Sequence, residues 1–252
     1  MQKEFYTEYY QVEDKHWWFV GRRQIILTLL DQRFRLGSQD HNILDVGCGT
    51  GTMLTYLARY GKVVGIDADA AAISFCRHRG LQNVRQYDGL TFPFEDRCFD
   101  LVTMFDVLEH IEDDTFALRE ILRVLKPSGT FMLTVPAYPI LWGAQDEISQ
   151  HKRRYVASQL RAKLKNSCFS IDKLSYFNSF LFPGIAAVRL LRRVLKTGRT
   201  SAADLKSDFT LTKGRGALNS LLSSLFGLER YVVAGPGFPF GISIIAIANR
   251  PR

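Results

Sequence analysis

The chain has 252 residues, of which 46% are hydrophobic and 23% charged, a composition that excludes an intrinsically disordered protein and is typical of a globular one. The net charge is +8, and the excess of basic residues lies in the part of the chain from His151 onward. This part could attract an anionic acceptor, an acidic membrane surface or nucleic acid, or it could be only a soluble basic surface. The four cysteines (Cys48, Cys76, Cys98, Cys168) form no C-x-x-C pair, so we expect no zinc site or disulfide framework, and a cytoplasmic location.

Residues 1–40 precede the first predicted strand and contain an aromatic and basic segment. The beginning of the chain lacks the basic flank and apolar core of a signal peptide. Trp17, Trp18 and Phe19 lead into a helical pattern from Gln24 to Leu30. Two interpretations stay open: the aromatic side chains pack this helix onto the sheet, or the segment covers a ligand, with aromatic faces attracting a cation and Arg22 or a neighbouring arginine binding a carboxylate.

A short apolar run from Ile43 to Val46 predicts a buried strand that enters a glycine-rich loop and a helix starting near Thr52. Gly47, Gly49 and Gly51 stand at alternate positions, and glycine lets a backbone turn sharply and approach a ligand closely. Such a loop binds an adenosine-type cofactor at the end of a parallel strand, although a glycine-rich turn without a ligand is the alternative. The third glycine of the dinucleotide fingerprint is replaced by Thr52, and no Gly-Lys-Ser/Thr follows, which excludes a P-loop.

The next two predicted strands each end near an acidic residue. The strand over 62–67 ends at Asp67. Its carboxylate could accept hydrogen bonds from both ribose hydroxyls of an adenosine-type cofactor, or it could cap the helix predicted over 70–79. We expect Asp69 to cap that helix and Asp67 to bind. The third strand, over 83–87, precedes Asp88 and Gly89, which form either a plain turn or part of the binding site.

Two further strands complete a βαβ pattern. A strand over 98–104 is followed by the run Phe105-Asp106-Val107-Leu108-Glu109-His110-Ile111, and a helix over 115–125 is capped by acidic residues at 113 and 114. A tight turn over 126–129 then leads into a strand over 130–136. Strands that alternate with helices predict a parallel sheet with right-handed crossovers.

The C-terminal part is harder to interpret. After a loop over 136–146, the basic segment 151–155 is either a lid on an acceptor pocket or a solvated turn, and we expect a helix near 157–166 and a strand over 169–177. The apolar and basic stretch over 176–196 is too short and broken to span a bilayer; it could lie on a membrane surface or pack as a helix. Residues 197–215 are predicted to form a linker, 217–226 a helix and 240–248 the last strand.

Several of these segments together resemble one family. The chain resembles class I S-adenosylmethionine-dependent methyltransferases of type 11/12 in five segments. These are the D-x-G-x-G-x-G pattern of Asp45 to Gly51, the run over 88–96, the "FD…VLEH" run over 105–110, the "LKPSG" turn and the "W…D…H-x-R-R-Y" pattern over 142–155. The resemblance is strongest over residues 40–136. It implies a Rossmann-like three-layer α/β/α sandwich with a seven-stranded, mostly parallel sheet, whose antiparallel last strand lies between strands five and six.

The resemblance also implies a domain organisation and a cofactor site. Residues 1–40 would form an N-terminal helical lid, and residues 41–252 the S-adenosylmethionine-binding domain, with an acceptor-side helical insertion at about 137–230. No cluster of metal ligands is visible in the sequence. The residues expected to bind the cofactor are Trp18, Arg22, Asp45, Gly47, Gly49, Gly51, Asp67, Asp88, Gly89 and Phe105.

The function that we expect is transfer of a methyl group from S-adenosylmethionine to a small-molecule, lipid-linked or sugar-linked acceptor, with release of S-adenosylhomocysteine. Oxygen is the favoured acceptor atom, and His110 and His151 are candidate general bases, although each could be purely structural. The alternatives are an RNA or protein methyltransferase and a non-catalytic scaffold that binds S-adenosylmethionine. No Asn/Asp-Pro-Pro-Tyr tetrapeptide follows the fourth strand, so nucleic acid is not the expected partner; the basic C-terminal part could contact a membrane surface peripherally.

Overall fold

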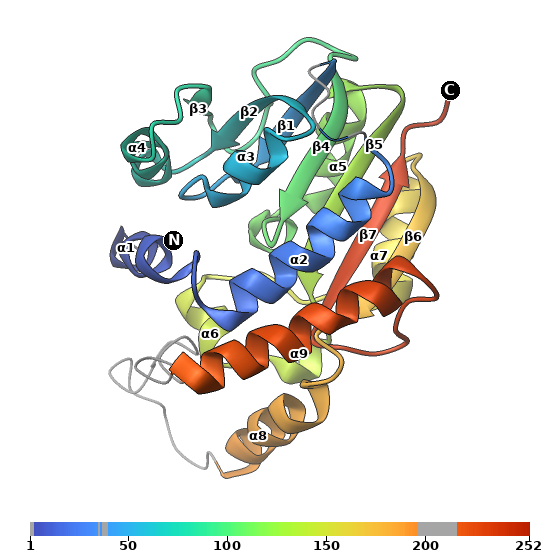
Figure 1. The fold of residues 1–252 in the computed structure, drawn as a ribbon. Coiled ribbons are helices and arrows are strands. Elements are labelled where there is room, and N and C mark those ends of the chain that lie inside the picture. The colour runs from blue at the N-terminus through green and yellow to red at the C-terminus, as the bar shows by residue number, and fades with distance from the viewer. Residues whose placement is uncertain (1–2, 35, 37–39, 196–215) are drawn as a thin grey trace.

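A mixed seven-stranded sheet organises the computed structural model, which describes residues 3–34, 36, 40–195 and 216–252 (Figure 1). The strands are β1 (His41–Val46), β2 (Gly61–Asp67), β3 (Val84–Gln86), β4 (Phe99–Phe105), β5 (Leu125–Pro136), β6 (Ser170–Phe177) and β7 (Ser243–Asn249). Their order in the sheet is β3-β2-β1-β4-β5-β7-β6, and β7 runs antiparallel to both of its neighbours. The expected sheet, with the antiparallel last strand between the fifth and sixth, is therefore confirmed.

Helices cover both faces of this sheet. In Figure 1, α5 and α7 lie on one face, and α2 and α9 cross the other. The expected three-layer α/β/α sandwich is therefore confirmed. The helices are α1 (Lys3–Val12), α2 (Trp17–Asp31), α3 (Thr52–Leu57), α4 (Ala70–His78), α5 (Asp114–Val124), α6 (Ala144–Ile148), α7 (Ala157–Asn166), α8 (Phe182–Leu195) and α9 (Gly216–Ala234), with short 3₁₀ helices η1 (Leu108–His110) and η2 (Pro139–Leu141).

Adjacent residues of the central strands point to opposite faces, and both faces are apolar. Leu44 and Val102 lie in the core with α5 and α7, whereas their neighbours Ile43 and Leu101 lie in the core with α2 and α9. Because side chains alternate along a strand, a strand covered on both faces becomes a continuous apolar run. This explains why the short apolar runs in the sequence predict the central strands correctly.

The N-terminal helix α2 packs along α9 (Figure 1). A Cβ at Gly21 would lie 2.3 Å from the Phe226 ring, so the two helices approach closely because glycine stands there. The Trp17 ring meets the same Phe226 ring edge to face at 5.8 Å. Trp17 thus takes the packing role that the sequence left open, but against α9 rather than the sheet.

Some element boundaries differ from those predicted. Helix α1 was not expected, and the helix predicted over 217–226 continues to Ala234 because Phe226 and Val233 are both buried on the α2 side of the sheet. The predicted tight turn over 126–129 lies inside β5, since Ser128 N–H donates to Arg250 O and Gly129 O accepts from Arg250 N–H. The linker predicted over 197–215 lies outside the described residues.

The predicted helix caps fit the structure in two cases. Asp69 Oδ1 accepts from Ala71 N–H at 2.8 Å, and Asp113 Oδ1 accepts from Phe116 N–H at 2.9 Å. The cap expected of Asp114 is wrong, because its carboxylate accepts hydrogen bonds from the Tyr155 hydroxyl and Lys163 Nζ instead. Within the described part of the chain, no helix is both long enough and apolar enough to cross a membrane.

Candidate functional site

A cavity of about 930 Å³ opens at the carboxyl ends of β1, β2 and β4. The glycine loop after β1 lines it, together with Asp67 at the end of β2 and Phe105 at the end of β4. In open α/β sheets, ligands bind in the crevice outside these strand ends. Side chains of the N-terminal segment, including Tyr9 and Trp18, line it too, so residues from the beginning of the chain form part of its wall.

The three glycines after β1 have different surroundings. Gly47 and Gly51 have φ angles of +69° and +88°, and a Cβ would lie 2.4 Å from Val107 and 2.5 Å from Leu81 respectively. Both positions therefore need glycine for backbone conformation and for close packing. At Gly49 a Cβ would meet no described atom within 4 Å, so the backbone there faces open space in the cavity.

Asp67 ties the end of β2 to this loop. Its Oδ2 accepts from Gly49 N–H and its Oδ1 from Asp69 N–H, both at 2.9 Å. The side chain is buried, and burial raises the pKa of its carboxyl above the ordinary value despite these two hydrogen bonds. Asp69 caps α4, as expected, while Asp67 is fixed at the cavity wall with further acceptor lone pairs on its oxygens.

Asp45 and Phe105 lie deeper in the wall. Asp45 is 3% exposed, and its Oδ1 accepts from the Thr103 hydroxyl at 2.6 Å. Burial raises the pKa of Asp45 to about 7, and the Thr103 hydrogen bond opposes this shift only in part. Phe105 packs into the core beside α2 and presents part of its ring to the cavity.

Asp88 and Gly89 occupy a turn at the rim. Asp88 is exposed, and its Oδ1 accepts from the backbone N–H groups of Leu90 and Thr91 at 2.8 and 2.9 Å. Gly89 lines the cavity with a φ angle of +81°, whereas Asp88 does not contribute to the lining. The structure therefore shows the turn at Asp88, and the binding role expected of this residue stays a prediction.

An ion pair connects α2 to the segment after β4. The Arg22 guanidinium pairs with the Asp106 carboxylate and lies 4.6 Å from the centre of the Trp18 ring. All three side chains line the cavity. A cation held over an aromatic face and beside a carboxylate has a fixed position, so Arg22 is oriented before any ligand arrives.

A second polar contact fixes the N-terminal segment over the loop. Glu13 accepts a hydrogen bond from the Thr50 hydroxyl and pairs with Arg79 at 2.6 Å. Arg79 Nε also donates to Thr50 O at 2.9 Å. This network joins the segment between α1 and α2 to both the glycine loop and α4.

The site fits a cofactor that carries an adenosine, a cation and a carboxylate. Gly49 leaves room at the loop, and Asp67 offers acceptors at the end of β2. Arg22 Nε and Thr52 Oγ1 are both buried, line the cavity and have no hydrogen-bond partner among the described residues. Buried donors of this kind are normally satisfied, so both atoms are available to an acceptor group of a ligand such as a carboxylate.

The two histidines expected as bases lie together. The rings of His110, in η1, and His151, in the loop after α6, are 4.8 Å apart between centroids and nearly perpendicular, and both line the cavity. Burial and the neighbouring His151 lower the pKa of His110 to about 4, so its imidazole is neutral at physiological pH. The sequence places these residues forty-one positions apart, and the fold brings them into contact.

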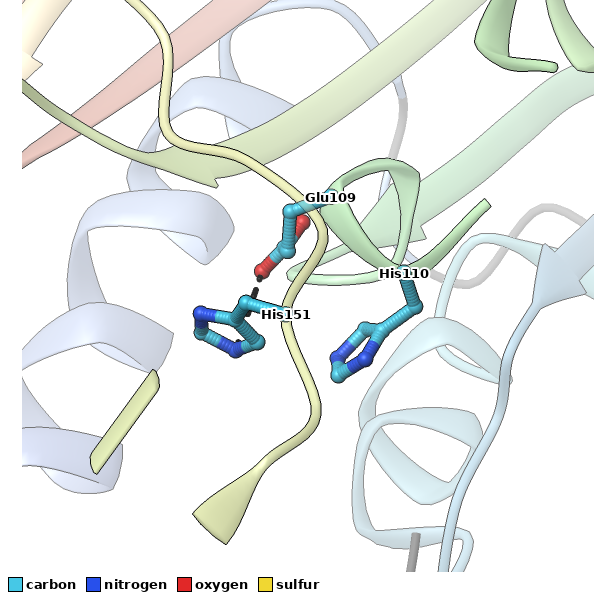
Figure 2. Close-up of side chains that lie close together, drawn as sticks. All are labelled: Glu109, His110 and His151. Atoms are coloured by element: carbon cyan, nitrogen blue, oxygen red, sulfur yellow. Dashed lines mark ion pairs between the residues drawn. The ribbon is translucent and has the colours of Figure 1, made fainter. Parts of the chain in front are cut away.

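Glu109 completes a group of three (Figure 2). It is fully buried, and Oε1 lies 3.8 Å from His151 Nε2. Neither carboxylate oxygen has a hydrogen-bond partner among the residues that the structure describes. Burial and the nearby Asp106 raise the pKa of Glu109 well above its usual value.

Asp146 orients His151 from the other side. Its Oδ1 lies 2.8 Å from His151 Nδ1 and 2.7 Å from Arg154 Nε, and its Oδ2 accepts from Arg154 Nη2 at 2.9 Å. Burial acts to raise the pKa of Asp146, but the hydrogen bonds from His151 and Arg154 outweigh it and hold the pKa at about 2. Because Asp146 is ionised and accepts from His151, Nδ1 carries a proton, and Nε2 faces Glu109.

These contacts show what the sequence missed. The solvated-turn interpretation of 151–155 is wrong, because Arg154 and Tyr155 are only 6% and 2% exposed. Asp146 and Glu109 belong to longer sequence motifs that predicted no role for either, whereas each lies within 4 Å of a ring nitrogen of His151. The signal available for Glu109 was its position: it is a charged residue directly after an apolar one, Leu108, which is buried in the structure.

Comparison with known proteins identifies the domain. Residues 44–133 match the family described as "Methyltransferase domain". The chain is 35% identical over 125 residues to the uncharacterized methyltransferase YcgJ of Bacillus subtilis (46% of this chain, 48% of that protein). It is 36% identical over 107 residues to the ubiquinone biosynthesis O-methyltransferase of Xanthomonas oryzae pv. oryzae (40% of this chain, 45% of that protein), so it spans about half the length of these curated relatives.

Solved structures agree on the fold. The crystal structure of the Bacillus subtilis YcgJ protein superposes with a TM-score of 0.55 at 22% identity, covering 92% of this chain and 99% of that one. The Haemonchus contortus phosphoethanolamine N-methyltransferase 2, solved with S-adenosyl-L-methionine, gives a TM-score of 0.56 at 21% identity over 91% of this chain and 53% of that one. Residues 44–133 therefore match a methyltransferase domain family, and the chain has the fold of class I S-adenosylmethionine-dependent methyltransferases.

Proposed function

We propose that the protein transfers a methyl group from S-adenosylmethionine to a hydroxyl oxygen of a small-molecule, lipid-linked or sugar-linked acceptor. The single observation that carries this proposal is that the glycine loop, Asp67 and two contacting histidines line one cavity. When bound, S-adenosylmethionine supplies an electrophilic methyl group. The protein then has to hold the acceptor in line and manage the acceptor's proton.

The cofactor end of the cavity is assigned to the loop and to α2. In this proposal, Gly49 admits the cofactor to the backbone, Asp67 accepts hydrogen bonds from the ribose, and Arg22 binds the carboxylate while Trp18 faces the sulfonium. The N-terminal residues 1–40 then act as a lid. The support is that Trp18 and Arg22 line the cavity, and that Arg22 is paired with Asp106 and lies over the Trp18 ring.

The acceptor end is assigned to the histidines. His110 is neutral because burial and His151 lower its pKa to about 4, so its free ring nitrogen is available to accept a proton at neutral pH. A hydroxyl that loses its proton to an imidazole becomes a far stronger nucleophile. Segment 137–230 would shape this end, because His151 and the loop around it belong to that segment.

Relatives suggest phenolic and quinone-type acceptors for the first tests. One matched protein is a ubiquinone biosynthesis O-methyltransferase, and another, 31% identical over 136 residues, is the demethylmenaquinone methyltransferase of Lactiplantibacillus plantarum. A lipid-linked acceptor would also give a use to the exposed apolar side chains Val188 and Leu191 of α8, which could contact a membrane surface. Sedimentation with anionic vesicles, with and without Leu191→Asp, tests that contact.

The experiment is to measure S-adenosylhomocysteine formation with catechol-type, lipid-linked, RNA and protein acceptors in parallel. Turnover with a hydroxylated small molecule supports the proposal. Turnover with RNA or protein alone would replace the acceptor class. Binding of S-adenosylmethionine without turnover on any acceptor would favour a scaffold, and absence of binding to folded protein would refute the cofactor role.

A further inference from the structure

We infer that Glu109, His110 and His151 form a binding site for a divalent transition-metal cation, such as Zn²⁺ or Mn²⁺, at the wall of the cavity (Figure 2). One ligand atom from each of the three side chains lies within 4.8 Å of the other two. Ligands about 2.1 Å from one ion are at most about 4.2 Å apart, so a small side-chain rotation closes the group around a cation.

The unpartnered carboxylate of Glu109 points to a cation rather than to packing alone. The side chain is completely buried, and within the described residues neither oxygen accepts a hydrogen bond. A buried carboxylate without a partner is strongly destabilising, and coordination of a metal is one of the ways in which proteins compensate such a group. The contact of 3.8 Å with His151 Nε2 is too long for a hydrogen bond but suits two ligands of one ion.

His151 is already arranged as a metal ligand. Its Nδ1–H donates to Asp146, which Arg154 holds with two hydrogen bonds, so Nε2 is left as the ligand atom. Metal-binding histidines usually donate their other ring N–H to a carboxylate or carbonyl in this way. Such an arrangement fixes the tautomer and the ring orientation before the metal binds.

The donor set selects the kind of cation. Two imidazoles and one carboxylate suit Zn²⁺, Mn²⁺ or Fe²⁺ better than Mg²⁺ or Ca²⁺, which prefer oxygen ligands. Three protein ligands also leave coordination positions open, and both histidines line the cavity, so these positions face an acceptor. Neighbouring Asp106 adds negative charge but is already paired with Arg22.

The catalytic consequence rests on the proposed methyl transfer, whereas cation binding does not. A hydroxyl bound to the cation has a lowered pKa and loses its proton to water. The acceptor oxygen then forms a bond to the methyl carbon while the sulfur–methyl bond breaks and leaves its electron pair on sulfur. In the metal-bound enzyme, His110 and His151 are thus ligands, and the cation replaces them as the means of activating the acceptor.

Binding is tested directly on the full chain after treatment with EDTA and gel filtration. We expect Co²⁺ to produce a visible absorption band that saturates at one equivalent, and Zn²⁺ to displace it. Glu109→Gln and His151→Asn should each weaken binding at least tenfold, and Asp146→Asn about 10–100-fold. His78→Asn is the matched control, because His78 is an exposed imidazole on α4 and should leave binding unchanged.

Two outcomes would overturn the inference. One is no saturable band up to about 1 mM Co²⁺, which would leave Glu109 as a protonated carboxyl; the other is unchanged affinity in folded Glu109→Gln. If that variant does not fold by circular dichroism, His110→Asn takes its place. Calorimetry with S-adenosylhomocysteine on the metal-free protein tests the cofactor site separately, so failure of one proposal is distinguishable from failure of the other.

Discussion

Asp67 and Asp69 provide a sharp test, because they are two residues apart and have different roles. Asp67 accepts from Gly49 N–H and Asp69 N–H and lines the cavity, whereas Asp69 caps α4 through Ala71 N–H. In Asp67→Asn, one carboxylate oxygen becomes an NH₂ group that faces a backbone donor or the ribose. A hydrogen bond to a charged group contributes about 1.5–3 kcal/mol, so binding of S-adenosylhomocysteine should weaken by roughly 10–150-fold.

The matched variant is Asp69→Ala. Loss of the helix cap should cost about 1 kcal/mol of unfolding free energy but change the Kd for S-adenosylhomocysteine less than about twofold. Isothermal titration calorimetry measures the Kd, and urea denaturation measures stability in the same samples. The reasoning is wrong if folded Asp67→Asn keeps the wild-type Kd, or if Asp69→Ala loses as much affinity as Asp67→Asn.

Two further predictions concern packing and pH. Gly21→Ala should destabilise the protein by about 1–3 kcal/mol, because its Cβ would lie 2.3 Å from Phe226. Gly184→Ala in α8, where a Cβ meets no described atom within 4 Å, should be neutral or stabilising by up to about 1 kcal/mol. Urea denaturation measures both variants, and a Gly21→Ala midpoint as high as that of Gly184→Ala would contradict the reasoning. Asp45 has a folded-state pKa of about 7 against an ordinary 3.8, so its proton is bound more tightly in the folded state, and stability should fall as the pH rises from about 4 to 7. Asp45→Asn keeps an acceptor for the Thr103 hydroxyl and should remove this slope, a gain on the order of 2–4 kcal/mol relative to wild type at pH 8, measured by urea denaturation at pH 5 and 8.

The sheet and the glycine loop could be predicted because local rules determine them. A run such as Ile43 to Val46 is apolar at every position because both of its faces are covered, and this pattern is visible without knowledge of the partners. Gly47 and Gly51 mark positive φ angles, which few other residues adopt. Helix α1 was missed because its packing partner, α4, begins 58 positions after α1 ends.

The histidine cluster could be predicted only in part, for a different physical reason. His110 and His151 were expected near the acceptor, but their contact depends on how the loop after α6 folds back onto η1, where Lys152 N–H donates to Glu109 O. No local sequence pattern predicts that the loop packs against η1. At Asp88 the local pattern predicts the turn correctly, because Oδ1 accepts from Leu90 and Thr91 N–H, while the binding role that the family pattern implies stays a prediction.

Glu109 shows what signal a sequence can still carry for such a cluster. It follows the fully buried Leu108 and precedes the cavity-lining His110, in a 3₁₀ turn too short to have a solvated face. An acid placed there is buried unless the turn is displaced, and a buried acid requires a partner. The partner is absent from the neighbouring sequence, so it must come from a distant segment or from a ligand. The distant segment supplies His151, which Asp146 orients. The 3.8 Å between His151 Nε2 and Glu109 Oε1 leaves room for an ion that both atoms bind.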